Sequence, residues 1–271
     1  MPDSLIVDLA DAGDALVAGG KAAALAKMMQ AGFNVPEGFV LLATDLDATV
    51  PALKEQLLDR FDQLAATYVA VRSSALNEDG VDAAWAGQLD TFLNTNRKTL
   101  LQNMARCQSS AGSARAQSYA EQQSLTTGLV AVIIQRMIQS DVSGVAFSVH
   151  PVTRDTNQIV IEAGLGLGEA IVSGEVTPDT YIVTKTSYQI IQTIVARQTK
   201  KMVLDDGVTS WQDAGDSGQA QKLTNDQITS LAAVVVQLEI FFGYPVDVEW
   251  ALYENKFYIL QSRPITALAA E

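Results

Sequence analysis

The sequence predicts an α+β fold in which antiparallel strands cluster in the second half of the chain. Alanine- and leucine-rich stretches in the first half favour helices. Short runs of β-branched and other apolar residues follow one another closely after residue 128, as is typical of strands. Near the end of the chain, two alternating segments flank Glu254-Asn255, which predicts a β-hairpin with a two-residue turn.

Helices are expected to dominate the first half. Residues 20–31 predict a helix that ends at Gly32. Residues 51–66 predict a second helix with Pro51 near its first turn, and the polar, alanine-rich residues 97–121 predict a third on the surface. Strands are predicted between these helices, at residues 39–42, 68–72 and 88–93.

Strands are expected to dominate the second half. Residues 205–220 are rich in Asp, Gly, Ser and Gln, which predicts an exposed loop. Thr224 is a favourable N-cap for a helix that runs to about Phe242. We expect two lobes, residues 1–126 and 127–271. The predicted strands are residues 129–137, 144–149, 158–162, 180–185 and 189–196, followed by the hairpin of residues 246–252 and 256–261.

The composition indicates a folded, acidic protein. Of the 271 residues, 48% are hydrophobic, which suffices for a sizeable core. The formal net charge of −13 argues against nucleic acid or an anionic membrane as the main partner, because both attract clustered Lys and Arg. No apolar stretch approaches a membrane span, and the first residues lack the features of a signal peptide. The single cysteine, Cys107, permits no intrachain disulfide, so we expect a cytoplasmic location.

Several common site motifs are excluded. Gly19–Lys21 resembles the end of a phosphate-binding P-loop, but Ala22 stands where that motif needs Ser or Thr. The glycines within residues 164–168 suggest a dinucleotide fingerprint, but Glu169 stands at its third glycine, and tight packing explains them equally well. His150 is the only histidine, which rules against a Cys/His metal cluster and a histidine-based triad.

Two cations in the first half are candidate phosphate ligands. Lys21 follows two glycines at a helix start, where the backbone can approach an anion and the helix N-terminus attracts it. Arg72 ends a predicted strand and precedes two serines. Its guanidinium group offers a rigid fork that suits phosphate oxygens.

The predicted hairpin carries the polar residues expected of a hard-cation site. Asp247 and Glu249 alternate on one strand, and Gln261 and Arg263 alternate on the other. If the strands pair in register, Glu249 and Gln261 offer oxygen ligands to one cation. Mg²⁺ accepts few protein oxygens and completes its shell with phosphate and water, which would leave Arg263 beside those phosphates.

Together these features resemble the nucleotide-binding domain of phosphoenolpyruvate synthase, pyruvate phosphate dikinase and rifampicin phosphotransferase. The matching stretches occur in the family's order and span nearly the whole chain. They are GGKAAALAKMMQAGFNVPEGFVL, VAVRSSALNEDGVDAAWAGQLDTFLN, VIIQRMIQSDVSGVAFSVHPVT, IVIEAGLGLGEAIVSGEVTPDTYIV and VDVEWALYENKFYILQSRPIT.

The resemblance implies an ATP-grasp fold with two lobes, antiparallel sheets and the nucleotide between the lobes. It also implies roles for individual residues. Lys21 and Arg72 resemble the family's phosphate-contacting cations, and Gly87 and Thr91 match a loop that approaches the triphosphate. Gln135 matches the residue at the adenine site. Glu249 and Gln261 match the metal and phosphate ligands, and Arg263 matches a further phosphate contact. Glu169 lies in a matching loop, but no role is assigned to it.

The resemblance further implies Mg²⁺-dependent cleavage of ATP to AMP and phosphate. In the family, one phosphoryl group passes to a histidine on a separate, swivelling domain. His150 lies within the nucleotide-domain match itself, and no carrier sequence follows Thr266. We therefore expect the carrier histidine to come from another protein or from a longer parent chain.

Two alternatives remain open at this point. The stretch between Lys21 and Arg72 is shorter than in the family, which favours a non-catalytic, nucleotide-binding or regulatory module. An ATP-grasp ligase that activates a carboxylate as an acyl phosphate would instead release ADP.

Overall fold

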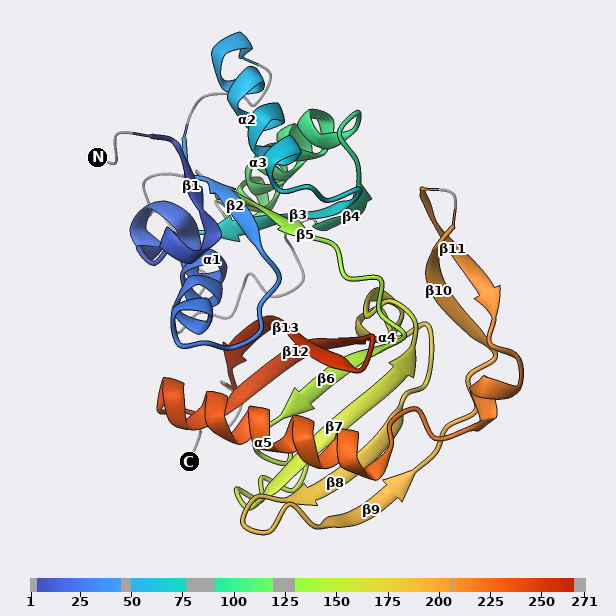
Figure 1. The fold of residues 1–271 in the computed structure, drawn as a ribbon. Coiled ribbons are helices and arrows are strands. Elements are labelled where there is room, and N and C mark those ends of the chain that lie inside the picture. Colours follow the sequence, from blue (N-terminus) through green and yellow to red (C-terminus); the bar gives the residue numbers. More distant parts are fainter. Residues whose placement is uncertain (1–3, 45–49, 77–90, 119–129, 206, 266–271) are drawn as a thin grey trace. The chain divides into compact units, whose positions relative to one another are not determined.

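The computed structural model describes residues 4–44, 50–76, 91–118, 130–205 and 207–265 (Figure 1). Contacts divide the chain into two compact units, Met1–Met137 and Ile138–Glu271. This boundary falls later than the one expected after residue 126, because residues 130–136 form a strand within the first sheet. Each unit combines helices with an antiparallel sheet, so the predicted α+β class is confirmed.

The first unit is built on a five-stranded sheet with the order β1-β2-β5-β3-β4, and every pair in it is antiparallel. Its elements are β1 (Ile6–Asp8), the short 3₁₀ helix η1 (Leu9–Asp11), α1 (Ala15–Gln30), β2 (Gly38–Leu41), α2 (Pro51–Gln63), β3 (Val69–Ala75), β4 (Thr91–Thr95), α3 (Leu100–Ser118) and β5 (Val130–Arg136).

The two faces of this sheet carry different contacts. On one face, α2 and α3 pack against alternate strand residues, including Val71 and Ile134, and form the main apolar core of the unit. The other face meets α1, whose small buried residues Ala22 and Ala26 let the helix lie close to β3 and β5. Polar side chains of β3 and β5 that share this second face therefore lie against α1.

The second unit is built on a six-stranded sheet with the order β13-β12-β6-β7-β8-β9, again antiparallel throughout. Its elements are β6 (Val142–Phe147), β7 (Gln158–Leu165), α4 (Glu169–Val172), β8 (Asp179–Thr184), β9 (Ile190–Ile194), β10 (Lys200–Asp205), β11 (Val208–Asp213), the 3₁₀ helix η2 (Gly215–Gln219), α5 (Asn225–Phe242), β12 (Val246–Tyr253) and β13 (Lys256–Pro264).

Helix α5 covers one face of this second sheet (Figure 1). Thr224 caps it as predicted, because its hydroxyl accepts a hydrogen bond from Gln227 N while the Gln227 side chain accepts one from Thr224 N. Leu231 and Val235 of α5 are fully buried, as is Val248 of β12. The odd-numbered residues Asp247 and Glu249 consequently face away from α5.

The predicted loop at residues 205–220 is wrong over its first part. Strands β10 and β11 instead form a two-stranded antiparallel ribbon, which η2 follows. The polar composition hid these strands because most of their side chains are at least partly exposed. Lys200 stacks over the ring of Trp211, 4.1 Å from its centroid, and this contact links the two strands.

A buried ion pair joins β8 to the segment before α5. Lys222 Nζ lies 3.1 Å from Asp179 Oδ1, and both side chains are fully buried. Asp179 Oδ2 accepts hydrogen bonds from Lys222 N and from the Tyr181 hydroxyl, at 2.9 and 2.7 Å. Lys222 Nζ also donates to the carbonyl oxygens of Ala196 and Gly218. The two charges are thus well supplied with partners despite their burial.

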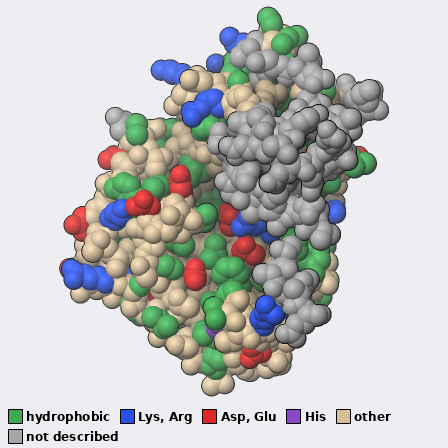
Figure 2. Space-filling view, turned by 180° about the vertical axis from the view of Figure 1, so that it is seen from behind, with side chains coloured by type: hydrophobic (Ala, Val, Ile, Leu, Met, Phe, Trp, Pro, Cys, Tyr) green, Lys and Arg blue, Asp and Glu red, His purple; other side chains and the backbone are tan. Residues whose placement is uncertain are grey.

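Figure 2 shows how charged side chains are distributed over one face of the molecule. In Figure 2, Lys and Arg side chains on the described part of the visible face stand singly or in small groups, interspersed with acidic and apolar ones. None of the helices in the described ranges is both long and apolar enough to cross a bilayer.

Candidate functional site

In the first unit, a kink in α1 brings its central turns onto the end of β3. Gly19 has φ +79° and ψ 162°, which interrupts the helix. A Cβ atom at Gly19 would lie 2.3 Å from Ser74 Oγ and 2.5 Å from Ser74 O, so only glycine fits here. Ala22 N then donates to Ser74 Oγ at 3.1 Å, which supplies an acceptor near the start of the second helical segment.

This kink places Lys21 against β3. Lys21 Nζ donates a hydrogen bond to Ser73 O at 3.0 Å. Ser73 follows Arg72 directly in the chain, so Lys21 is hydrogen-bonded to the position of β3 next to Arg72. The sequence predicted both cations but not the packing of Gly19 that connects them.

Arg72 and Gln135 lie on the α1 face of the sheet. In the β3–β5 register, Ala70 is opposite Gln135 and Arg72 is opposite Ile133, so the two polar side chains are diagonal neighbours. Arg72 Nη1 donates to Gln135 Oε1 at 3.4 Å, and Gln135 Nε2 donates to Pro36 O at 3.1 Å. Only 7% of Arg72 and 2% of Gln135 is exposed. The guanidinium group is therefore held within the protein rather than extended into solvent.

Thr91 is the partner of Arg72 on the other side of β3. The β3–β4 register pairs the two residues directly, and the Thr91 side chain is exposed at the start of β4. The structure thus places Lys21, Arg72, Thr91 and Gln135 along β3, which continues past Arg72 to Ala75 rather than ending at Arg72 as predicted. Gly87 lies outside the described residues.

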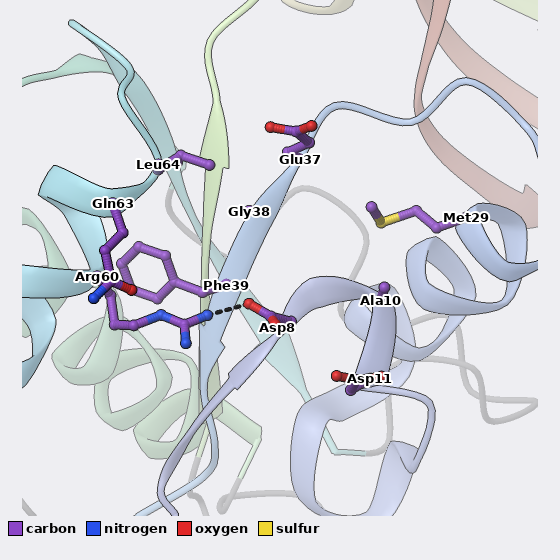
Figure 3. Close-up of a pocket in the computed structure, with 10 residues that line it drawn as sticks. All are labelled: Asp8, Ala10, Asp11, Met29, Glu37, Gly38, Phe39, Arg60, Gln63 and Leu64. Atoms are coloured by element: carbon purple, nitrogen blue, oxygen red, sulfur yellow. Dashed lines mark hydrogen bonds and ion pairs between the residues drawn. The ribbon is translucent and has the colours of Figure 1, made fainter.

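A pocket of about 410 Å³ lies elsewhere in the first unit (Figure 3). Asp8, Phe39 and Arg60 are among its lining residues, and Arg60 forms an ion pair with Asp8 while lying over the Phe39 ring. None of the site residues predicted from the sequence lines this pocket. The polar residues along β3 are therefore distinct from this pocket.

In the second unit, the predicted hairpin of β12 and β13 is confirmed. Glu254 and Asn255 form its turn with φ values of +49° and +59°, as a two-residue turn of the type favoured in hairpins requires. The register shifts between Glu249 and Trp250, because Trp250 pairs with Ile259 whereas Glu249 pairs with Gln261. Leu260 is the extra residue of a β-bulge.

The bulge determines which side chains share a face. Asp247 is opposite Arg263 and Glu249 is opposite Gln261, so all four face away from α5. Without the extra residue, Glu249 would be opposite Leu260, and Gln261 would point to the α5 side. The alternation in the sequence predicted each pair on its own strand, and the bulge aligns the two pairs.

Arg263 neutralises part of the acidic charge on this face. Its Nη2 atom lies 3.1 Å from Asp247 Oδ2 and 3.7 Å from Glu249 Oε1. The pKa of Asp247 is raised, mainly because burial disfavours its charged form, and Arg263 offsets this only in part. Asp247 Oδ1 is buried and finds no hydrogen-bond partner among the described residues.

The oxygen donors on this face suit a hard divalent cation. Glu249 and Gln261 offer a carboxylate and an amide oxygen from directly opposed positions. The part of the chain that the structure describes holds no group of three or more His, Cys, Asp or Glu side chains placed to bind a metal. A site with so few protein ligands fits Mg²⁺, which retains waters and takes phosphate oxygens, better than it fits Ca²⁺ or Zn²⁺.

The row of polar residues continues across the sheet to Glu162, which was not singled out from the sequence. Glu249 is opposite Val145 of β6, and Val145 is opposite Glu162 of β7. Its pKa is raised, first by burial and then by the negative charge of Asp247. A lone carboxylate within the apolar strand IVIEAGL was the available signal.

The remaining motifs have structural explanations. Gly166 has φ +85°, and a Cβ there would lie 2.3 Å from Met202 O, so the glycine-rich loop packs tightly against β10. Ser140 and Ser143 donate to Gly166 O. His150 Nδ1 accepts hydrogen bonds from Val152 N and Thr153 N, so His150 stabilises its own loop. Glu169 is exposed at the start of the short α4.

Comparison with known proteins points to one family. The family profile described as "Pyruvate phosphate dikinase, AMP/ATP-binding domain" matches residues 44–271. An uncharacterized phosphotransferase, YvkC of Bacillus subtilis, is 34% identical over 93% of this chain and 34% of its own length. A probable phosphoenolpyruvate synthase of Methanocaldococcus jannaschii is 34% identical over 94% of this chain and 26% of its own.

Rifampicin phosphotransferase of Bacillus subtilis is also similar, at 40% identity over 84% of this chain and 27% of its own length. The chain thus spans about a third or less of the length of these curated relatives.

Proposed function

The chain belongs to the family of pyruvate phosphate dikinase AMP/ATP-binding domains, and on that premise we propose that it binds Mg–ATP and transfers a phosphoryl group from it. The single observation that carries the proposal is the bulged hairpin, which aligns two oxygen donors and an arginine on one face of the sheet. Phosphoryl transfer depends mainly on positioning and charge neutralisation, and such a face supplies both.

The first unit would supply the cations that bind the triphosphate. Lys21 and Arg72 are fixed by hydrogen bonds to Ser73 O and to Gln135, so little side-chain entropy is lost when they contact phosphate. Thr91 adds a hydroxyl donor beside Arg72. Gln135 would contact the adenine, and its link to Arg72 would connect base recognition to phosphate recognition. Gly87 is proposed to lie near the triphosphate from the resemblance alone.

The second unit would hold the metal. Glu249 and Gln261 would bind Mg²⁺, and Arg263 would contact phosphate. When bound, the cation neutralises charge on the phosphate oxygens. Arg263 already forms ion pairs with Asp247 and Glu249, and these ion pairs keep its guanidinium group at the same edge of the sheet.

The acceptor is proposed to be a histidine on another domain or protein. ATP, water and that histidine would give AMP, phosphate and phosphohistidine. His150 is ill suited to the role, because its Nδ1 atom already accepts two backbone hydrogen bonds in its own loop. The names of the relatives, phosphoenolpyruvate synthase and rifampicin phosphotransferase, support transfer to a further acceptor.

The test is to incubate the chain with Mg–ATP, with and without a histidine carrier domain from a family member, and to separate the nucleotides by chromatography. We expect AMP and phosphate only when the carrier is present, together with acid-labile label on the carrier. ATP binding without turnover would refute the transferase role and leave a nucleotide-binding module. ADP as the product would indicate a ligase instead.

A further inference from the structure

Glu162 stands in the same cross-strand row as the proposed metal ligands. The row runs from Gln261 through Glu249 and Val145 to Glu162, each directly opposite the next. Neighbouring strands are about 4.8 Å apart, so Glu162 is roughly 10 Å from Glu249 along the sheet. This spacing is too wide for one coordination shell and matches the size of a bound polyphosphate.

The Glu162 carboxylate has no neutralising cation among the described residues. Among the described residues, no Lys or Arg forms an ion pair with it. Arg263, which is opposite Asp247 and outside this row, contacts Asp247 and Glu249 instead. Thr180 of β8 is the neighbour of Glu162 on the other side. Half-burial and the charge of Asp247 raise its pKa, which moves a carboxylate toward the range where it accepts protons effectively near neutral pH.

The reaction proposed above needs such a group. Forming AMP, phosphate and phosphohistidine from ATP breaks two phosphoanhydride bonds, and the histidine attack accounts for only one. The other requires water, whose oxygen forms a bond to the phosphorus that leaves as phosphate. The bond from that phosphorus to its bridging oxygen breaks, and the electron pair stays on the bridging oxygen. A proton of the water must pass to a base.

We propose that Glu162 is the general base that accepts this proton. The assignment rests on the proposed function, and it adds a residue and a step to it. In that function Glu249 and Gln261 bind the metal. Glu162 lies on the same face of the sheet but is not a metal ligand. A base beside the phosphate that is released would orient the attacking water as well as deprotonate it.

The experiment compares Glu162→Gln with wild type, using the full chain, Mg–ATP and the same carrier domain. Glutamine has nearly the same shape but cannot act as the base, so phosphate release should slow by roughly 100- to 10,000-fold. The acid limb of the pH–rate profile should also disappear. ATP affinity, measured by calorimetry without the carrier, should stay within about threefold, because the substitution removes no proposed ligand of ATP.

Two further variants separate catalysis from folding. Glu162→Ala should lose phosphate release and regain part of it when formate is added, because formate can enter the vacated space as a base. Glu175→Gln changes an exposed carboxylate that pairs with Lys200 in the same unit, and it should behave as wild type.

Wild-type phosphate release with an unchanged acid limb in Glu162→Gln would overturn the assignment while leaving the proposed function intact. Absence of AMP formation by the wild-type chain with its carrier would overturn both.

Discussion

The packing of Gly19 against Ser74 yields a prediction that links the fold to the proposed phosphate site. Gly19→Ala places a Cβ 2.3 Å from Ser74 Oγ, at a residue whose φ is +79°. With ψ at 162°, this backbone conformation is essentially restricted to glycine and costs alanine about 1–3 kcal/mol. Relief of the overlap requires α1 to shift from β3, and overpacking of this kind costs about 1–3 kcal/mol. We expect the free energy of unfolding to fall by about 2–6 kcal/mol in total.

Two glycines of the same unit provide matched controls. Gly32 also has a positive φ, +86°, but a Cβ there would meet nothing within 4 Å. Gly32→Ala should therefore lose only the conformational part, about 1–2 kcal/mol. Gly13 has neither constraint, and Gly13→Ala should stay within about 0.5 kcal/mol of wild type. The three variants separate backbone strain from steric overlap.

Urea unfolding followed by circular dichroism measures these differences, and calorimetry measures ATP affinity in the folded protein. Because the shift of α1 would draw Lys21 away from Ser73 O, ATP should bind more weakly in Gly19→Ala, by roughly 10- to 150-fold for one charged contact of about 1.5–3 kcal/mol. If Gly19→Ala is no less stable than Gly32→Ala and binds ATP as wild type does, the reasoning from close packing is wrong.

Three further predictions concern the second unit. Glu249→Ala and Arg263→Ala should each remove about 1.5–3 kcal/mol of transition-state stabilisation without changing the circular dichroism spectrum, and wild-type turnover in both would contradict the site assignment. Glu162 has a raised pKa in the folded protein, so its contribution to stability is present below the unfolded-state pKa and is lost as the pH rises through the folded-state value. Glu162→Gln should therefore be more stable than wild type at pH 7 but not at about pH 4, as urea unfolding at the two pH values will show. Lys222→Met leaves the fully buried Asp179 carboxylate without its cation and should cost about 3–5 kcal/mol, and a loss below about 1 kcal/mol would contradict its burial.

Local sequence patterns predicted much of the architecture. The helix at α5 followed from its Thr224 cap and apolar run, and the hairpin followed from alternation around Glu254-Asn255. These features depend on residues within a few positions of one another, and such short-range preferences are visible in a single sequence. The ribbon of β10 and β11 was missed because its exposed strands carry no apolar alternation, and only their mutual pairing defines them.

The candidate residues were also predicted in part. Lys21, Arg72, Glu249, Gln261 and Arg263 were each recognisable from residue type and motif context. Sequence order alone could not reveal that Lys21 is held to the strand of Arg72, because 52 residues separate Lys21 from its acceptor Ser73.

The sequence by itself determined which residues alternate on each strand, where α2 and α5 begin and which polar side chains are available for chemistry. The tertiary structure decided how those side chains combine. The bulge at Leu260 brings Gln261 to the face of Glu249, and two further strand pairings place Glu162 in the same row. Side-chain alternation is a property of one strand, whereas register is a property of two, and a shift of one residue between strands reverses the face on which a side chain lies.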